Sequence, residues 1–273
     1  MVENYDEDVK LYYREELLTK KEESAQDASL DMSYAGWEID IPNIAAMPNE
    51  EYAMARRHGL GGSDASIVLG VNPYKTIQEL IDEKARDTLT EEEKAVGDKV
   101  AVRKGRDLEP LIIQKFEKAF GMKTWKPIDM YVCKQFPYLK MNFDGVTGKP
   151  GAYIPAEIKV VTARGERHYN PSKAIYIEGE GLKPLPENVS QHNISIQSKA
   201  AHYGIPPYYY TQLQQEIMAS GAPYGYLSTL YDKDWILRTY FAWRDDAVIQ
   251  DIIVQGYKTW EAVVALNPDR ELQ

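Results

Sequence analysis

The sequence predicts an α/β fold in which helices flank a central mixed β-sheet. Apolar residues at helical spacing dominate residues 49–121, strand-like segments fill residues 123–161, and a helix followed by a strand pair comes after residue 206. With 273 residues, the chain is long enough for one sizeable core, or for one domain with an appendage. We therefore expect residues 49–273 to fold as one domain behind an N-terminal extension.

The first 48 residues differ from the rest in charge. Residues 1–50 contain thirteen Asp and Glu against four Lys and Arg, whereas the remaining 223 residues hold 29 acidic and 28 basic groups. The net charge of −10 therefore comes mainly from an acidic extension, residues 1–48, which we expect to be poorly ordered or loosely docked, with a short helix near residues 9–21. An arm that mimics nucleic acid or contacts a partner protein is the alternative. Because residues 51–273 are nearly neutral overall, a local basic surface there can still bind phosphate groups. The net charge of the chain therefore does not exclude a nucleic-acid partner.

Caps and glycines mark the helices in the first part of the domain. Asn49 can cap a helix that ends near Gly59, a Gly-rich turn at residues 61–64 precedes a helix over 65–69, and Thr76 opens a third helix. The fourth helix is predicted from apolar residues at helical spacing before Gly121, namely Leu108, Ile112, Phe116 and Phe120.

The second part of the domain starts with a long segment, residues 162–205, that has no clear periodicity. Gly, Pro, Lys and Arg are mixed there, and a stretch of this length inside a compact domain is usually functional or disordered. The elements expected after it are a helix over 210–219 that stops at Gly221, a β-hairpin of strands 224–231 and 235–243, and an amphipathic helix over about 245–265.

One predicted strand carries charged residues on one face. Twelve residues separate Asp144 from Glu157, and Lys159 follows two positions later. Because side chains alternate along a strand, Glu157 and Lys159 point the same way while Ile158 points into the core. The segment before Asp144 is also strand-like, and a turn over residues 145–151 is expected to join the two strands as a hairpin. The pattern suits a hard divalent cation together with a lysine that orients or deprotonates a water.

Three further signals accompany this motif in chain order. Glu109 lies on the helix upstream of the strands, Arg56 precedes Ser63 by seven residues, and residues 208–214 open the helix that follows the strands. Helix, strands, helix and strand is the order expected of a restriction-endonuclease-like core. The ordered set covers about residues 50–265 and resembles the YqaJ/lambda-exonuclease family of viral recombination nucleases, in the PD-(D/E)xK nuclease superfamily.

The resemblance implies a metal-dependent cutting centre. Asp144, Glu157 and Glu109 correspond to the metal-binding carboxylates, the main-chain carbonyl of Ile158 to a further ligand, and Lys159 to the catalytic lysine. Two Mg²⁺ ions are expected as cofactors, and Mn²⁺ can substitute for them. Two hard cations bridged by carboxylates can activate a water and neutralise the leaving oxygen of a phosphodiester.

The resemblance also implies a pocket for a 5′-terminal phosphate, formed by Arg56, Ser63 and Gln212. Arginine offers a forked donor, and serine adds a hydroxyl and a helix-start amide. Asn142 falls where the family can carry a small hydroxyl residue, and its amide can still donate a hydrogen bond. Tyr209 matches an aromatic residue of the family motif and is a possible DNA contact.

Neighbouring residues leave some of these assignments open. Arg57 differs from the phosphate-binding arginine by one position, and Gln214 and Gln215 offer the same side chain as Gln212. Ser63 can be a plain helix cap, which is compatible with phosphate binding. The run of tyrosines at 208–210 can stack on unpaired bases, although packing of at least one ring in the core is the stronger expectation.

Residues 162–205 are expected to be an insertion near the active site. It either packs against a neighbouring subunit or contacts DNA through Arg164, Arg167, Lys173 and Lys183. Three of the four histidines, His168, His192 and His202, belong to this segment and lack the spacing of metal ligands.

The function implied for the nuclease domain, residues 49–273, is a Mg²⁺-dependent 5′→3′ exonuclease that acts on double-stranded DNA ends. It would leave 3′ single-stranded tails for a single-strand annealing protein, and the family suggests a trimeric ring. Two alternatives stay open: an endonuclease of the same fold, and a non-catalytic module that binds DNA ends or a partner.

The expected location is the cytoplasm of a bacterial host, with a phage or prophage origin. A single cysteine, Cys133, fits a reducing compartment and excludes an internal disulfide framework. No stretch is apolar for the 18 or so residues that a membrane span needs, so no membrane partner is expected.

Overall fold

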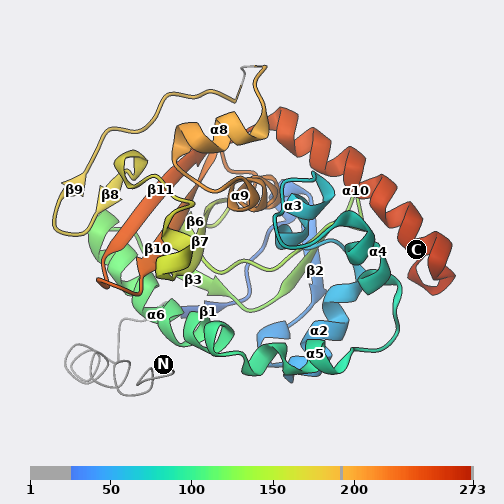
Figure 1. Ribbon diagram of the computed structural model, residues 1–273. Coiled ribbons are helices and arrows are strands. Elements are labelled where there is room, and N and C mark those ends of the chain that lie inside the picture. Colours follow the sequence, from blue (N-terminus) through green and yellow to red (C-terminus); the bar gives the residue numbers. More distant parts are fainter. Residues whose placement is uncertain (1–25, 191–192, 272–273) are drawn as a thin grey trace.

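The computed structural model describes residues 26–190 and 193–271, and its centre is a mixed β-sheet with helices on both faces (Figure 1). Within these residues the main sheet has eight strands in the order β1-β3-β6-β7-β10-β11-β8-β9. In that order the strands are Gln26–Ala28, Thr124–Pro127, Val146–Lys149, Ala152–Val161, Tyr224–Tyr231, Leu237–Trp243, Tyr176–Ile177 and Gly181–Leu182. The pairs β1–β3 and β7–β10 are parallel and the other pairs antiparallel, which confirms the predicted α/β fold with a mixed sheet.

Helix α6, Val100–Phe120, covers one face of the sheet. Its apolar side packs against β7, β10 and β11, and it ends at Gly121 in the left-handed conformation (φ 64°). Figure 1 shows this helix along the lower edge of the view. The predicted stop is confirmed, but the helix begins eight residues before Leu108. The expectation rested on the buried apolar side, whereas the first turns are solvent-facing and include the exposed Val100 and Val102.

Helix α9, Pro207–Ser220, covers the opposite face of β7 and β10. It is itself enclosed by α3 (Ala65–Val68), α8 (Ile196–Tyr203) and α10 (Asp246–Leu266), so a helix at the centre of the protein is buried almost all round. This environment explains why polar residues of α9 such as Gln214 and Gln215 are fully buried and bonded to main-chain carbonyls.

Strand β7 separates two environments, as the two-residue period of the sequence predicts. Ala156 and Ile158 join the apolar core under α6, whereas Glu157 and Lys159 face α9. The parallel partner β10 sets the register, with Glu157 opposite Leu227 and Lys159 opposite Thr229.

The hairpin around Asp144 differs from the expectation. The strand before Asp144 is β5 (Lys140–Met141), and it belongs to a separate sheet with β2 (Trp37–Ile41) and β4 (Met130–Cys133). The hairpin partner of β7 is β6, which lies inside the predicted turn, with the tight turn at residues 150–151. Val146 and Thr147 are buried β-branched residues that pair with β7, whereas the expectation gave more weight to the surrounding glycines.

The packed domain starts earlier than residue 49. Strands β1 and β2 pair with β3 and β4, and the side chains of Met32, Trp37 and Ile44 are at most 1% exposed. Residues 26–48 are therefore an integral part of the core and not a loosely docked extension. Their acidic residues lie at the surface between apolar anchors, which is why composition alone misjudged them. The helix expected near residues 9–21 lies outside the described residues.

The other predicted helices agree with their expected positions. They are α2 (Asn49–Ala55), which continues as a 3-10 turn to His58, α3, α4 (Ile77–Ala85), α9 and α10, whereas the short helix α5 (Glu91–Lys94) was not predicted. Thr76 caps α4 in a capping box with Glu79, as expected, while Pro48, not Asn49, occupies the cap of α2. Across the described residues, none of the helices combines the length and the apolarity that crossing a membrane requires.

The described residues of the segment 162–205 are more ordered than the sequence suggested. They form α7 (Ala163–Glu166), a 3-10 turn at Pro171–Lys173, strands β8 and β9 at the edge of the main sheet, and α8. Strand β8 pairs with β11 through Ile177 and Tyr176, so the segment extends the sheet beyond the hairpin. Whether it is an insertion relative to the family stays a prediction.

Candidate active site

The charged face of β7 brings the predicted catalytic triplet together. The Lys159 ammonium lies 3.0 Å from Asp144 Oδ2 and also contacts Glu157 Oε1, so one cation bridges both carboxylates. The main-chain N–H of Ile158 lies 3.4 Å from the same Asp144 oxygen. Burial lowers the pKa of Lys159, but Asp144 and Glu157 raise it more, so that the net pKa is well above its usual value. The lysine is therefore a charged donor in this arrangement.

Behind the triplet lies a carboxyl group that the sequence reasoning missed, Glu216 of α9. Gln212, one turn earlier on the helix, donates through Nε2 to Glu157 Oε1 at 2.5 Å and to Glu216 Oε1 at 3.1 Å. Both carboxyl groups are at most 2% exposed. The only sequence signal is the four-residue spacing of Gln212 and Glu216, which puts them on one helix face.

Burial and neighbouring charges shift the pKa values of the three carboxyl groups in this cluster. Burial raises the pKa of Glu157 well above normal, and the charges of Asp144 and Glu216 raise it further. Burial, with a contribution from Asp144, raises the pKa of Glu216 to about 7. The pKa of Asp144 is lowered, because the favourable charge of Lys159 and its hydrogen bonds outweigh burial. One ammonium group cannot balance three carboxylates, so the raised pKa values of Glu157 and Glu216 favour their protonated, neutral forms.

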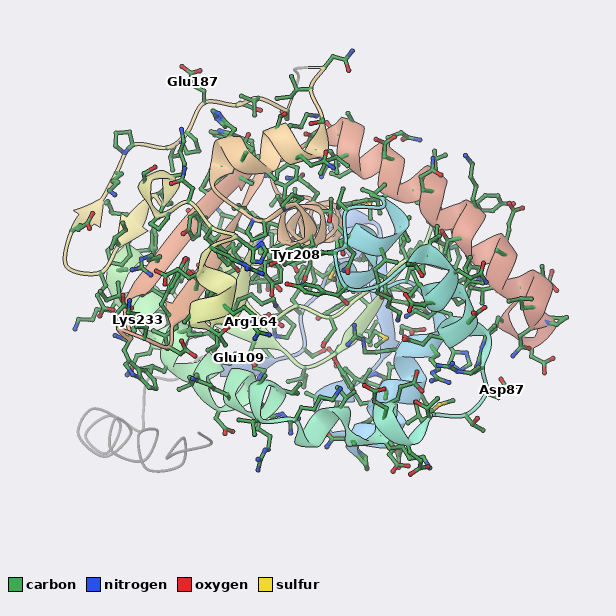
Figure 2. All side chains as sticks on the ribbon, viewed as in Figure 1. Asp87, Glu109, Arg164, Glu187, Tyr208 and Lys233 are labelled. Carbon is green, nitrogen blue, oxygen red and sulfur yellow. The ribbon has the colours of Figure 1, made fainter. Side chains whose placement is uncertain are left out.

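Glu109 approaches from the other side of the sheet. It lies on α6, 2.7 Å from Lys126 of β3, and it lines a cavity of about 630 Å³ together with Asp144, Ile158 and Lys159. Burial and the charge of Asp144 raise the pKa of Glu109, which places the two carboxylates within electrostatic reach. Figure 2 labels Glu109 in the lower left part of the view.

The donor set has the chemistry of a magnesium site. Asp144, Glu157 and Glu109 offer hard oxygen ligands. Ile158, whose main-chain carbonyl is the predicted further ligand, lines the 630 Å³ cavity. Glu157 Oε2 is buried without a hydrogen-bond partner. As the side chains stand, however, no three Asp, Glu, His or Cys side chains in the described part of the chain are grouped closely enough to hold a metal ion. The residues fit the ion chemically, and coordination requires their side chains to converge.

A second cavity, of about 280 Å³, joins the catalytic residues to the predicted phosphate pocket. Its walls include Asp144 and Lys159 and also every residue predicted to contact a 5′ phosphate, namely Arg56, Ser63, Asn142 and Gln212, with Tyr209 beside them. The two cavities share Asp144 and Lys159 at their junction. Segments far apart in the sequence thus supply one continuous site.

Arg56 and Ser63 form the fixed part of the pocket. The guanidinium donates from Nη2 to Ser63 Oγ at 2.9 Å. Burial lowers the pKa of Arg56, but Tyr52 and the carboxylates of Asp64 and Glu83 raise it more, so the side chain stays charged. Asp64 does not compete for the guanidinium as a bonded partner, because it accepts hydrogen bonds from Lys84 at 2.8 Å and from the N–H of Gly61 at 2.9 Å.

The structure distinguishes the open alternatives by burial. Arg57 is 2% exposed and bonds to main-chain carbonyls and to Glu93 at 2.8 Å, so it serves the fold. Gln214 and Gln215 are fully buried and donate to main-chain carbonyls. Of these two arginines and three glutamines, only Arg56 and Gln212 line the 280 Å³ cavity.

Gln212 and Asn142 are both engaged within the site. The Gln212 amide nitrogen is directed to Glu157 and Glu216, so in this arrangement it orients carboxylates and does not face a phosphate as a donor. Asn142 accepts a hydrogen bond from Tyr52 at 3.1 Å and donates one to the Asp129 carbonyl at 3.2 Å. Tyr52, which also lines both cavities, is a second site residue that sequence reasoning missed, since nothing in the α2 sequence sets it apart.

The three predicted DNA contacts occupy different positions. Tyr209 lies over Lys159, with the ammonium 5.6 Å from the ring centroid. Arg164 and Arg167 are exposed on and just after α7, the short helix that follows β7, and neither belongs to the walls of the two cavities.

Comparison with known proteins agrees with this architecture. Residues 51–223 match the family described as the YqaJ-like viral recombinase domain. The uncharacterized protein YqaJ of Bacillus subtilis (strain 168) is 32% identical over 98 residues, a match that covers 36% of this chain and 30% of that protein. The chain therefore spans less than a third of that relative's length in the match.

Among solved structures, the alkaline exonuclease LHK-Exo of Laribacter hongkongensis has a similar fold. Its TM-score is 0.50 at 16% identity, with 79% of this chain and 93% of that chain covered. This match concerns the arrangement of the sheet and the helices alone. Because the family match covers more than half of the chain and includes Asp144, Glu157 and Lys159, the chain belongs to the family of YqaJ-like viral recombinase domains.

Proposed function

We propose that the protein is a Mg²⁺-dependent exonuclease that degrades one strand of double-stranded DNA in the 5′→3′ direction and leaves 3′ single-stranded tails. One observation carries the proposal: a single cavity joins Asp144 and Lys159 to Arg56 and Ser63. Carboxylates and a lysine suit phosphodiester hydrolysis, and a charged arginine bonded to a serine suits a terminal phosphate. The fold shared with an alkaline exonuclease is consistent with it.

In the proposed cutting centre, residues from the two faces of the sheet have different roles. Asp144, Glu157, Glu109 and the Ile158 carbonyl would hold two Mg²⁺ ions, which Mn²⁺ can replace, and these supply Lewis-acid stabilisation of the phosphodiester. Lys159, as a charged donor, orients the attacking water or a phosphate oxygen. Gln212 and Glu216 fix the carboxylate of Glu157 from behind.

End recognition is assigned to the opposite wall of the cavity. Arg56 and Ser63 hold the 5′ phosphate, and Asn142 has one amide hydrogen left after its bond to the Asp129 carbonyl. Contacts to a terminal phosphate carry no base sequence, so cutting is expected to tolerate any sequence. A single-strand annealing protein as partner and a trimeric ring remain proposals that rest on the family.

A digestion assay tests the proposal. Linear duplex DNA with or without a 5′ phosphate is incubated with the protein in Mg²⁺ or EDTA, beside a Lys159→Ala variant. We expect Mg²⁺-dependent release of mononucleotides, faster on the phosphorylated end, and loss of release in EDTA and in the variant. Absence of Mg²⁺-dependent release contradicts the exonuclease proposal. Equal rates on both ends remove the role given to Arg56 and Ser63, and cutting of circular duplex favours the endonuclease.

A further inference from the structure

Tyr74 is the most exposed large aromatic side chain in the described part of the chain, with 73% of its surface accessible. It lies in the loop between α3 and α4, and it lines a third cavity, of about 560 Å³, whose walls also include Arg56 and Ser63. This cavity therefore adjoins the proposed phosphate pocket through two of that pocket's own residues. Neither the proposed cutting centre nor the proposed phosphate pocket makes use of the Tyr74 ring.

The ring is braced on one side by other aromatic residues. Tyr74 meets the edge of Tyr208 with ring centroids 5.8 Å apart, and Tyr208 in turn lies 4.6 Å from Tyr209, the residue over Lys159. His168 supports Tyr208 from a third direction, at 6.3 Å. Figure 2 labels Tyr208 close to the centre of the molecule. The aromatic row thus runs from an exposed ring to the catalytic lysine.

The loop that carries Tyr74 is tied to the phosphate pocket by hydrogen bonds. The N–H of Tyr74 donates to Asn72 Oδ1 at 2.8 Å, and Asn72 Nδ2 donates to Ser66 Oγ at 2.8 Å. Ser66 Oγ then donates to the carbonyl of Ser63 at 3.1 Å. Three short links therefore fix the position of the ring relative to the serine that faces the phosphate, so the ring is held in place before any ligand binds.

The charge of the 560 Å³ cavity suits a phosphodiester strand. Its carboxylates are paired with cations within the protein: Asp64 with Lys84, Glu83 with Lys75, and Glu93 with Arg57. Arg56 donates to a neutral serine, and Arg106 of α6 is exposed at the wall that this cavity shares with the 630 Å³ cavity. Positive charge beside an exposed ring is the combination that binds unpaired nucleic acid.

We propose that Tyr74, braced by Tyr208, is a stacking surface for an unpaired base at the end of the DNA strand whose terminal phosphate is held by Arg56 and Ser63. The inference rests on the proposed function and adds a base-binding position to it. Every base has a π-face, so the contact tolerates any sequence. Tyr74 acts as a positioning residue, because it holds the strand end and does not touch the reacting atoms.

A fluorescence experiment tests the stacking directly. The probe is a 5′-phosphorylated duplex with 2-aminopurine at the first, second or third nucleotide of the phosphorylated strand, bound to Lys159→Ala protein in Mg²⁺ or to wild-type protein in EDTA. We expect quenching at one of these positions, and Tyr74→Ala to abolish it and weaken binding about tenfold. Tyr74→Phe and Tyr74→Trp keep the ring and should retain both. Tyr257→Ala removes another exposed tyrosine, 53% accessible on α10, and should change neither.

Kinetics and the controls decide the remaining outcomes. With wild-type catalytic residues, Tyr74→Ala should raise KM with kcat nearly kept, since the ring only holds the end. Unchanged quenching and affinity in Tyr74→Ala overturn the stacking role, and so does an equal loss in Tyr74→Phe, which would assign the effect to the hydroxyl. If wild-type protein neither binds DNA ends nor digests them, the proposed function fails and this inference fails with it. If it digests DNA while Tyr74→Ala behaves normally, only the inference fails.

Discussion

The two faces of strand β7 show how one strand can serve stability and chemistry separately. On the face toward α6, Ile158 and its neighbours pack in an apolar core. On the face toward α9, Glu157, Lys159 and Glu216 crowd three charges into a space that excludes most water. Apolar burial stabilises a fold, whereas burying like charges costs stability. The comparison suggests that the core side of this strand offsets the cost of the catalytic side.

The sharpest test of the comparison is a substitution on the charged face. Glu157→Gln should lower the rate of nucleotide release by about 10³-fold, because it removes one of the carboxylates proposed to hold Mg²⁺. Stability should stay the same or rise, since burial already raises the pKa of Glu157 well above normal and the charged form is disfavoured. Nucleotide release and thermal unfolding in EDTA measure the two effects. A large loss of stability together with activity would contradict the division of roles.

The reverse result is expected one residue later. Ile158→Ala removes buried apolar atoms and should destabilise the fold by about 2–5 kcal/mol. It keeps the main-chain carbonyl, so kcat per folded molecule should change little at a temperature where the variant is folded. Urea unfolding and active-site titration of the folded fraction give the two numbers. A kcat loss comparable to that of Glu157→Gln would show that the two faces are not independent.

The sequence predicted these faces because their information is local. A two-residue period assigns Glu157 and Lys159 to one side and Ile158 to the other, and capping at Thr76 and the stop at Gly121 are equally local. No local pattern predicts that Arg56, Ser63 and Asp144 line one cavity. That prediction came from the order of the motifs, which resembles the order in the family.

Most of what the sequence did not predict depends on long-range contacts. The docking of residues 26–48 is set by partners about 100 positions away, as for Trp37 opposite Cys133. The pairing of β7 with β6 is a local hairpin, and it was missed because the glycines around Val146 and Thr147 were given more weight than these two β-branched residues. Glu216 looks like any helix glutamate until α9 is seen to be buried from all sides. Tyr74 gains meaning only from its position beside Ser63. Such features follow from tertiary packing, which the local periodicity of the sequence does not predict.

A smaller effect concerns the proton balance of the charged face. A carboxyl group whose pKa is raised in the folded state binds its proton more tightly there than in the unfolded chain. Stability from that group is therefore full below about pH 4.5 and is lost as the pH rises toward its folded pKa, about 7 for Glu216. In EDTA, the wild-type free energy of unfolding should fall across this range more than that of Glu216→Gln, by on the order of 3 kcal/mol. Urea unfolding at pH 5 and pH 7.5 measures the difference, and parallel curves for the two proteins would refute it.

The smallest expected effect is that of a substitution in α7, which follows the end of strand β7 and belongs to neither of its two faces. Arg164 is exposed on α7, next after β7, and lines neither of the two cavities that contain Lys159. If DNA approaches over the end of β7, Arg164→Ala should weaken binding only a few-fold and lower the salt dependence of affinity by about one phosphate contact, with kcat unchanged. Lys258→Ala, which removes an exposed cation on α10, is the matched control and should leave the salt slope as it is. Equal slopes for wild type and Arg164→Ala would place the DNA path elsewhere. A fall in kcat would instead mean that the charged face extends past Val161 into α7.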